Sequence, residues 1–253
     1  MSTIRIVIPA RFASSRLPGK PLLDICGKPM IARVVEQVLG HFEHIYVATD
    51  DQRIIDVVSQ YDVTPVMTSE LHESGTDRLA EVAELHHFSD DDIVVNLQGD
   101  EPLIEPELLQ QVAELLSINN AAIATLMTPI DDVEDLLNPN VVKVVHGANN
   151  NALYFSRAPI PYPRDAFNQD KSVMPEGEYF RHLGLYAYRV SALKAIPHLP
   201  SSKLENLEKL EQLRPLAAGL NIAIDVACQI PKAGVDTQED LDKVIAVFAG
   251  ASN

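Results

Sequence analysis

The sequence predicts an α/β fold: a Rossmann-like, doubly wound and mainly parallel sheet with a smaller mixed or antiparallel extension. Two observations point to it. Up to about residue 120, short apolar runs rich in β-branched residues alternate with segments of helical period. After about residue 121, strand-like runs follow one another closely. The first pattern is typical of parallel strands joined by helices, and the second indicates added antiparallel or mixed strands.

Four apolar runs in the first half are predicted strands: IRIVI (4–8), HIYVAT (44–49), the short run 65–67, and DIVVNLQGD (92–100). The segments that alternate with them space their apolar residues as helices do. These predicted helices are 30–39, 54–61, 76–85, and a helix that begins at Glu105-Pro106 and ends near Leu116.

The second half is predicted to continue with strands at 121–130, 141–145, 151–156, 182–190 and 222–228. Residues 159–178 contain four prolines and form a loop-like insertion, a kind of segment that is usually functional or interfacial. Leucines recur every three residues over 204–216, which we interpret as one amphipathic helix. Thr237, followed by Asp240, predicts a capping box at the start of a last helix.

Charge is distributed unevenly along the chain. The 253 residues carry a net charge of −16, yet the first 33 contain six basic residues and one acid. That segment therefore carries +5 and the other 220 residues carry −21. The overall acidity argues against a nucleic-acid partner, because a long phosphate backbone is repelled by such a field. The basic opening segment still suits a small anion.

The remaining composition sets the expected environment. Two cysteines, Cys26 and Cys228, make no disulfide framework, and we expect buried thiols in a reducing compartment. No apolar run approaches the roughly 18 residues that span a membrane, and the first apolar stretch, interrupted by Arg5, is no signal peptide. We expect a cytoplasmic protein without a membrane partner.

The segment PARFASSRLPGKPL (9–22) is the strongest functional signal. It follows a predicted strand and holds three cations, two serines and a Pro-Gly pair. Backbone amides at a tight glycine turn, together with Arg and Lys side chains, form a cradle for phosphate oxygens. It is no Walker A loop, since Pro21 follows Gly19-Lys20. No two glycines of the chain are separated by one residue, which argues against a dinucleotide-binding dehydrogenase.

Ligands of open α/β sheets bind outside the carboxyl ends of the strands. Three segments meet that condition: the loop after Ile8, the Gly99-Asp100 turn, and the loop before Thr237. A carboxylate at Asp100 is a natural Mg²⁺ ligand, because Mg²⁺ prefers a few carboxylate oxygens plus substrate phosphates and water. Asp100 could equally be an ordinary turn residue, and Glu101 is the neighbouring alternative ligand.

Seven segments together resemble the sugar nucleotidyltransferases that make CMP-sugars, and among them the CMP-Kdo synthetases, which activate 3-deoxy-D-manno-octulosonate (Kdo). The likeness runs in order from about residue 3 to about 245. Its segments are the opening loop with SGTDR (74–78), VNLQGDEP (95–102), NALYFSRAPIP (151–161), RHLGLYAYR (181–189), LEKLEQLR (207–214) and GVDT (234–237).

The resemblance implies a nucleotide-diphospho-sugar transferase-like fold and a Mg²⁺-dependent enzyme of lipopolysaccharide synthesis. It would transfer CMP from CTP to the anomeric 2-hydroxyl of Kdo and release pyrophosphate. It also implies one domain over 1–253, with a CTP-binding half (1–120) and a sugar-binding and dimerisation half (121–253). The partner would be a second copy, in a homodimer formed through the 159–178 insertion and nearby strands.

The resemblance also implies residue roles. Arg11, Ser14 and Lys20 would hold the triphosphate, and Arg16 would neutralise charge near it. Asp100 and Asp236 would bind the metal. Arg11, Arg16, Lys20, Asp100 and Asp236 would thus be the catalytic set. The residues expected to read cytosine are Gln98, Ser74, Gly75 and Thr76, with Ala10 and Arg78 in support. The residues expected to bind the sugar acid are Arg157, His182, Tyr186, Glu211 and Gln212.

Other interpretations remain open at this point. Ser74 or Thr76 could simply cap a helix, and Tyr186, His182 and Glu211 could be ordinary structural residues. The chain could instead be a CMP-sialic acid synthetase, a relative that prefers 8-amino-Kdo, or a non-catalytic nucleotide-binding regulator on the same fold.

Overall fold

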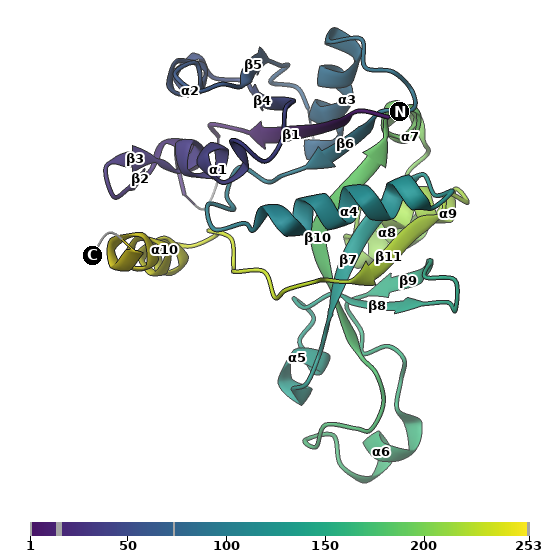
Figure 1. The fold of residues 1–253 in the computed structure, drawn as a ribbon. Helices are drawn as coiled ribbons and strands as arrows, with labels where there is room; N and C mark the ends of the chain where they lie inside the picture. Colours follow the sequence, from purple (N-terminus) through teal and green to yellow (C-terminus); the bar gives the residue numbers. More distant parts are fainter. Residues whose placement is uncertain (1, 14–16, 73, 252–253) are drawn as a thin grey trace.

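The computed structural model describes residues 2–13, 17–72 and 74–251, and nine of its strands form one sheet. The main path of the sheet has the order β11-β7-β10-β6-β1-β4-β5, and β8 and β9 extend it beside β10 (Figure 1). The strands of the first half are β1 (Ile4–Ala10), β4 (Ile45–Thr49), β5 (Thr64–Met67) and β6 (Ile93–Asn96). Those of the second half are β7 (Ile123–Pro129), β8 (Lys143–His146), β9 (Ala152–Ser156), β10 (Phe180–Arg189) and β11 (Ile222–Val226).

The direction of the strands confirms a mainly parallel sheet with a mixed extension. β1 pairs in parallel with β4 and β6, β4 with β5, and β11 with β7. β10 is antiparallel to both β6 and β7, so it alone runs against the others along the main path. The antiparallel pairs of β8 with β9 and β10 complete the extension.

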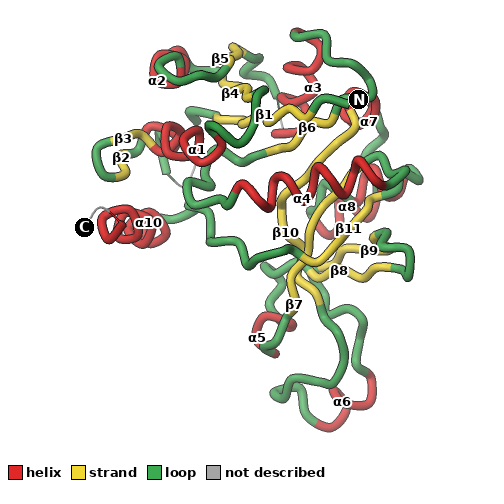
Figure 2. Tube along the Cα trace, viewed as in Figure 1, coloured by secondary structure: helices red, strands yellow, loops and turns green. Residues whose placement is uncertain are grey.

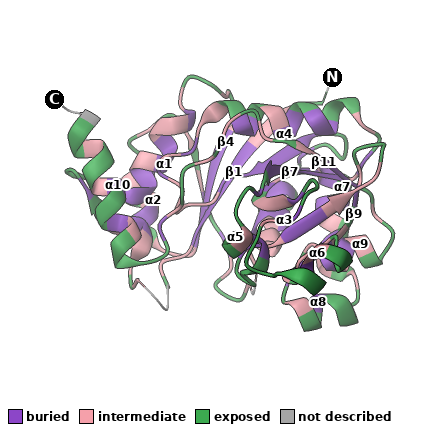
Figure 3. Ribbon diagram, turned by 90° about the horizontal axis from the view of Figure 1, so that it is seen from below, coloured by how far each residue is buried: buried purple, intermediate pink, exposed green. Residues whose placement is uncertain are grey.

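Helices cover both faces of the sheet, which confirms the doubly wound arrangement. Alternate strand residues point to opposite faces, so Ile6 and Ile8 join one apolar cluster and Val7 joins the other. The first cluster is closed by α1 (Met30–Val38), α2 (Gln52–Val58) and α4 (Pro106–Ile118). The second is closed by α3 (Gly75–Leu85), α7 (Val190–Ala195) and α9 (Leu213–Ala217). The strands between these layers are buried (Figure 3).

The Pro-rich insertion lies away from the sheet, beyond the ends of β7 and β10 (Figure 2). It contains a short helix, α6 (Arg164–Gln169), and packs near α5 (Val133–Leu137). The two share a small apolar cluster of their own, which includes Leu136, Phe167 and Tyr179.

The predicted helix over 204–216 is wrong. The segment forms two short helices, α8 (Lys203–Glu208) and α9, separated by a turn in which Lys209 has a left-handed backbone (φ 54°). A repeat of three does not match the 3.6-residue period of a helix, and Leu207 is 81% exposed while Leu213 is fully buried. In the turn between the two helices Leu210 packs in the second apolar cluster, and the break changes the direction of the chain before α9.

The last helix, α10 (Gln238–Ala251), begins at the predicted capping box. The Thr237 hydroxyl accepts a hydrogen bond from the backbone N–H of Asp240 (3.2 Å), and the Asp240 carboxylate accepts one from the N–H of Thr237 (2.9 Å). α10 packs against the hairpin of β2 (Asp24–Ile25) and β3 (Lys28–Pro29), in a cluster that includes Ile25, Val235 and Leu241. This packing carries the segment before α10 back to the edge where β1 and β6 end.

The expected burial of the cysteines is also wrong. Cys26 and Cys228 are both exposed free thiols. Cys26 lies in the tight turn of the β2–β3 hairpin, where the backbone φ is 51°, and its thiol donates to the carbonyl oxygen of Ile245 on α10 (3.6 Å). Among the described residues, no helix is long and apolar enough to cross a membrane.

Candidate active site

Two adjoining depressions lie at the carboxyl ends of β1 and β6. We call the first, of about 420 Å³, the outer hollow, and its lining includes Ala10, Arg11, Lys20, Gly99, Asp100 and Asp236. We call the second, of about 430 Å³, the inner cavity, and its lining includes Asn96, His182, Tyr186, Tyr188, Gln212 and Arg214. Ser74, Gly75, Gln98 and Glu211 line both. The two depressions therefore form one continuous site at the predicted edge of the sheet.

A close backbone approach holds the outer hollow together. A Cβ atom on Gly99 would lie 2.8 Å from the carbonyl oxygen of Pro9, so only glycine lets the loop after β6 lie against the end of β1. The N–H of Val235 donates to the carbonyl oxygen of Asp100 (2.9 Å), which attaches the segment before α10 to the same loop. The three strand-end segments predicted to form the site thus meet.

Lys20 links the two aspartates of the outer hollow. Its Nζ lies 2.5 Å from Oδ2 of Asp100 and 3.2 Å from Oδ1 of Asp236. The lysine side chain is 12% exposed, whereas the side chains of Asp100 and Asp236 are 34% and 64% exposed, so the carboxylates remain open to solvent. A cation placed between two carboxylates from distant parts of the chain shows that the fold builds an anionic pair suited to a positive ion.

Glu101, the alternative metal ligand, has a raised pKa. Burial, together with the nearby charges of Asp100 and Glu105, raises the pKa of Glu101 to about 7. A carboxyl group that is half protonated near neutral pH is a poorer ligand for a hard cation than an ionised one. The raised pKa therefore makes Glu101 a less suitable metal ligand.

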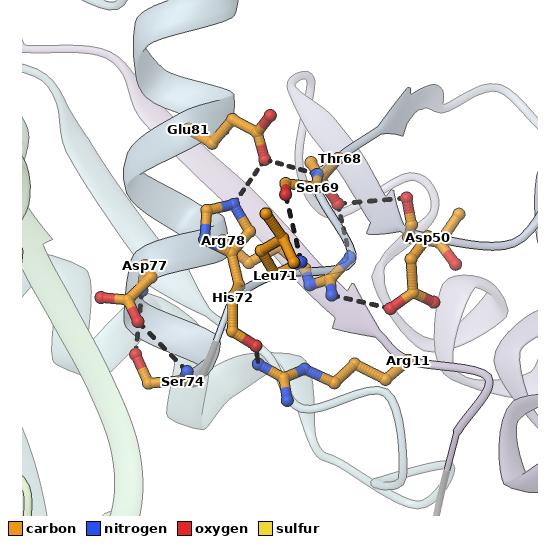
Figure 4. A network of polar contacts seen from close by, with 11 residues as sticks. Arg11, Asp50, Thr68, Ser69, Leu71, His72, Ser74, Asp77, Arg78 and Glu81 are labelled. Atoms are coloured by element: carbon orange, nitrogen blue, oxygen red, sulfur yellow. Dashed lines mark hydrogen bonds and ion pairs between the residues drawn. The ribbon is translucent and has the colours of Figure 1, made fainter.

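The N-terminus of α3 forms the wall between the two depressions. Ser74 is the N-cap: its hydroxyl accepts the N–H of Asp77, and the Asp77 carboxylate accepts the N–H of Ser74 (both 3.1 Å; Figure 4). The capping interpretation of Ser74 is therefore confirmed, and it leaves the residue lining both depressions. Arg11 donates to the carbonyl oxygen of His72, just ahead of the cap (Figure 4).

Arg78 lies behind this wall. Its guanidinium donates to Thr68 (2.5 Å) and to Asp50 (2.8 Å), and the side chain is fully buried (Figure 4). It does not line either depression. In the structure Arg78 therefore anchors α3 to the ends of β4 and β5 and can support the nucleotide site only through that position.

His182 is a neutral residue of the inner cavity. Burial lowers its pKa to about 3, and its ring packs edge-on against Phe155. Its Nε2 lies 3.0 Å from the hydroxyl of Thr125, which also lies within hydrogen-bond distance of the carbonyl oxygens of Leu183 and Leu185. Because the Thr125 proton goes to a carbonyl, we infer that Nε2 donates to Thr125 and Nδ1 is left as an acceptor.

Two tyrosines on β10 continue the wall of the cavity. The rings of Tyr186 and Tyr188 are stacked with their centres 5.7 Å apart. Burial raises the pKa of both hydroxyls above the usual value, so both stay protonated and can donate. The Tyr188 hydroxyl shares a hydrogen bond with Thr76 at the start of α3.

Glu211 and Gln212 occupy the turn between α8 and α9. Glu211 faces both depressions, and Gln212 faces the inner cavity. Burial raises the pKa of Glu211, while Arg214 lowers it. Arg214 is held by a bidentate pair with Glu205, with contacts of 2.6 to 3.1 Å. The break that replaced the predicted single helix is what presents Glu211 and Gln212 to the site.

Arg157 lies elsewhere in the structure. Its guanidinium donates to the carbonyl oxygens of Glu208 (2.6 Å), Pro139 (2.8 Å) and Lys209 (3.4 Å), and it does not line either depression. In this arrangement it fixes the α8–α9 turn from behind. Ser14 and Arg16 lie outside the described residues.

Sequence reasoning missed several polar residues of the inner cavity, among them Asn96 and Arg214. Asn96 had a signal, since it is the one polar residue in the apolar run IVVN of β6. Arg214 had little signal in the sequence, because an arginine at the end of a charged, leucine-rich segment is usually solvent-exposed and nothing marks this one as a cavity residue.

The chain matches the family model of the cytidylyltransferases over residues 5–222. It is 53% identical to the 3-deoxy-manno-octulosonate cytidylyltransferase of Pseudoalteromonas translucida over 242 residues, which are 95% of this chain and 96% of that protein. It is 52% identical to the protein of the same name from Neisseria meningitidis serogroup A, over 98% of this chain and 99% of that one.

Solved structures give the same result. A CMP:2-keto-3-deoxy-manno-octonic acid synthetase complexed with CTP superposes with a TM-score of 0.88 at 44% identity, over 99% of this chain and all of that one. A 4-diphosphocytidyl-2C-methyl-D-erythritol synthase superposes with a TM-score of 0.65 at 12% identity, over 98% of this chain and 99% of that one, which shows a shared fold. These likenesses confirm the predicted nucleotidyltransferase-like fold.

Proposed function

This chain belongs to the 3-deoxy-manno-octulosonate cytidylyltransferases, and from that premise we propose that its site transfers CMP from CTP to the anomeric 2-hydroxyl of Kdo. The products are CMP-Kdo, a precursor for lipopolysaccharide synthesis, and pyrophosphate. The observation that carries the residue assignment is the pairing of Lys20 with both Asp100 and Asp236 in the outer hollow.

The outer hollow is proposed to bind the triphosphate of CTP. Arg11 and Lys20 line it and supply positive charge, and the first amides of α3 add a partial positive charge. Stabilising charge on the transferring phosphoryl group is the main catalytic task in such reactions. Ser14 and Arg16 are proposed to complete this set.

A divalent cation, Mg²⁺, fits the donor set of the outer hollow. Asp100 and Asp236 would hold it, since two carboxylates plus phosphate oxygens and water are ligands that Mg²⁺ accepts. Among the described residues, no cluster of three or more His, Cys, Asp or Glu side chains offers a fuller metal cage. When bound, the metal would polarise the phosphoryl group and favour loss of the hydroxyl proton.

The shared wall and the inner cavity are proposed to bind the base and the sugar. Ala10, Gly75, Thr76 and Gln98 would read the cytosine, with Ser74 and Arg78 holding α3 in place. In the inner cavity, His182, Tyr186, Glu211 and Gln212 offer acceptors and donors for sugar hydroxyls. Arg157 is proposed to contribute to the sugar carboxylate site through the turn that it fixes. The 2-hydroxyl then attacks the α-phosphorus in line, and no covalent enzyme intermediate forms.

A pyrophosphate-release assay with CTP, Mg²⁺ and Kdo tests the function. We expect turnover that depends on all three components, with sialic acid and 8-amino-Kdo as competing substrates. CTP binding without turnover would indicate a regulator, and a preference for either competitor would assign that substrate instead. Asp100→Ala is expected to abolish turnover with an unchanged fold by circular dichroism. Asp62→Ala, at an exposed residue after α2, is the matched control.

We further propose that residues 1–120 supply most of the CTP site and that residues 121–253 supply the sugar site and a dimer interface, with Asp236 crossing between them. The reaction is assigned to the cytoplasm, where CTP is available.

A further inference from the structure

Asn96 is an amide in an apolar setting. It ends β6, whose four residues are all buried, and it is 5% exposed. Its neighbours across the sheet are Val7 on β1 and Tyr186 on β10. Because side chains alternate along a strand, Asn96 shares a face with Val94, which packs in the second apolar cluster. The strand itself gives no reason for an amide at this position.

The amide is also unsatisfied. Its Oδ1 is buried and has no hydrogen-bond partner among the described residues. Buried polar side chains are normally hydrogen-bonded, since an unpaired one destabilises the folded state. An amide kept at this position despite that cost indicates a partner that the protein alone does not supply.

The position of Asn96 selects the partner. Asn96 lines the inner cavity with His182 and Tyr186, and it does not line the outer hollow with Lys20 and Asp100. A half turn about its Cβ–Cγ bond exchanges Oδ1 and Nδ2, so either end of the amide can face the cavity. A hydroxyl group both donates and accepts, and therefore matches either end.

We propose that Asn96 is a binding residue for the sugar acid and forms a hydrogen bond with one of its hydroxyl groups in the inner cavity. This assignment rests on the proposed function and adds a residue to its sugar site. The sugar then supplies a partner for the end of the amide that faces the cavity. A sugar that lacks the matching hydroxyl would leave the amide buried and unpaired and would be rejected.

The test compares wild-type protein with Asn96→Leu, because leucine has nearly the shape of asparagine but no polar atoms. We expect the KM for Kdo to rise about tenfold or more, as for the loss of a buried hydrogen bond, and the KM for CTP to stay unchanged. The melting temperature of the free variant should be equal to or higher than that of wild type, since an unpaired polar group is removed. Asn221→Leu, at an exposed position before β11, is the matched control and should change neither KM.

Each outcome decides a separate question. Wild-type turnover combined with an unchanged KM for Kdo in Asn96→Leu would overturn the assignment of Asn96 and leave the proposed function intact. A rise in both KM values with a lower melting temperature would also overturn it, because that pattern indicates a structural role. No turnover by wild type would overturn the proposed function and this assignment with it. If Asn96→Leu does not fold, Asn96→Ala gives the same comparison of the two KM values.

Discussion

At the scale of residues, the ammonium group of Lys20 lies between the two aspartates of the outer hollow. Lys20 lies within 3.2 Å of carboxylate oxygens of both Asp100 and Asp236. A lysine ammonium and a divalent cation cannot occupy the same space between two carboxylates. We therefore expect the lysine to act as the internal counter-ion of the free protein and to turn toward phosphate oxygens when the metal arrives with CTP.

Replacing Lys20 with methionine tests this exchange. The variant lacks the positive charge that lies 2.5 Å from Asp100 and 3.2 Å from Asp236 and competes with a divalent cation, so the affinity of the nucleotide-free protein for Mn²⁺ should rise by about tenfold. Titration followed by electron paramagnetic resonance measures it without any turnover. Lys28→Met, at a lysine paired with Glu36 on the surface, should leave Mn²⁺ binding unchanged. Equal or weaker Mn²⁺ binding by Lys20→Met would contradict the exchange.

His182 gives a prediction about pH. Its pKa is about 3 in the folded protein and ordinary, near 6.5, in the unfolded chain. The unfolded chain therefore binds more protons between these values, and stability falls as the pH drops through that window. The loss is at most about 1.4 kcal/mol for each pH unit. Thermal unfolding of wild type and His182→Gln from pH 7 to pH 4 measures it.

The variant should lose less stability on acidification than wild type does. Parallel pH curves for the two proteins would show that His182 titrates normally in the folded state. Glu101 acts in the opposite sense, since its raised pKa of about 7 makes the folded state bind the extra proton at pH values below that. Both proteins contain Glu101, so its effect cancels in the comparison.

At the scale of elements, the apolar periodicity of the sequence predicts helices and strands. It does not predict a helix break that depends on the backbone angle of one residue. β1, β4, α1 and α4 lie where their apolar patterns predict them. The break at Lys209 was not predictable, because left-handed backbone is usual for glycine and rare for lysine. The directions in which the Arg78 and Arg157 side chains point were not predictable either, because a sequence motif gives the residue but not the direction of its side chain.

The contact between the β6 loop and the end of β1 gives a prediction at this scale. Gly99→Ala would place a methyl group 2.8 Å from the carbonyl oxygen of Pro9, and the loop must move away. Overpacking of this kind costs about 1–3 kcal/mol. We expect a lower melting temperature and a higher KM for CTP. Gly250→Ala, where a new Cβ meets nothing within 4 Å, is the control. A Gly99→Ala protein with wild-type values would show that the loop tolerates displacement.

At the scale of the whole molecule, the acidic surface and the basic opening segment have separate roles. The net charge of −16 is the sum of +5 on the first 33 residues and −21 on the other 220. Part of the acid lies in the same place, because Asp100 and Asp236 converge on Lys20. Composition alone indicated a small anionic ligand, but the convergence needed the fold, since 136 positions separate the two aspartates in the sequence.

The exposed apolar residues of the 159–178 insertion predict a dimer. Tyr162 and Val173 on the insertion are 54% and 60% exposed, and Leu153 on the adjacent β9 is 61% exposed. Exposed apolar side chains on the insertion and on β9 favour burial against a second copy. Light scattering should give about twice the mass of the 27.8 kDa chain, and Tyr162→Asp should lower it. A wild-type mass equal to one chain would contradict the dimer.

The path of the chain before α10 has a consequence for synthesis on the ribosome. Lys20 and Asp100 emerge from the ribosome well before Asp236, which follows β11 in the sequence and pairs with Lys20 in the folded chain. A nascent chain therefore contains Lys20 and one carboxylate of the outer hollow before the second carboxylate has been synthesised. A divalent ion that needs both carboxylates could be held only after residue 236 has been added.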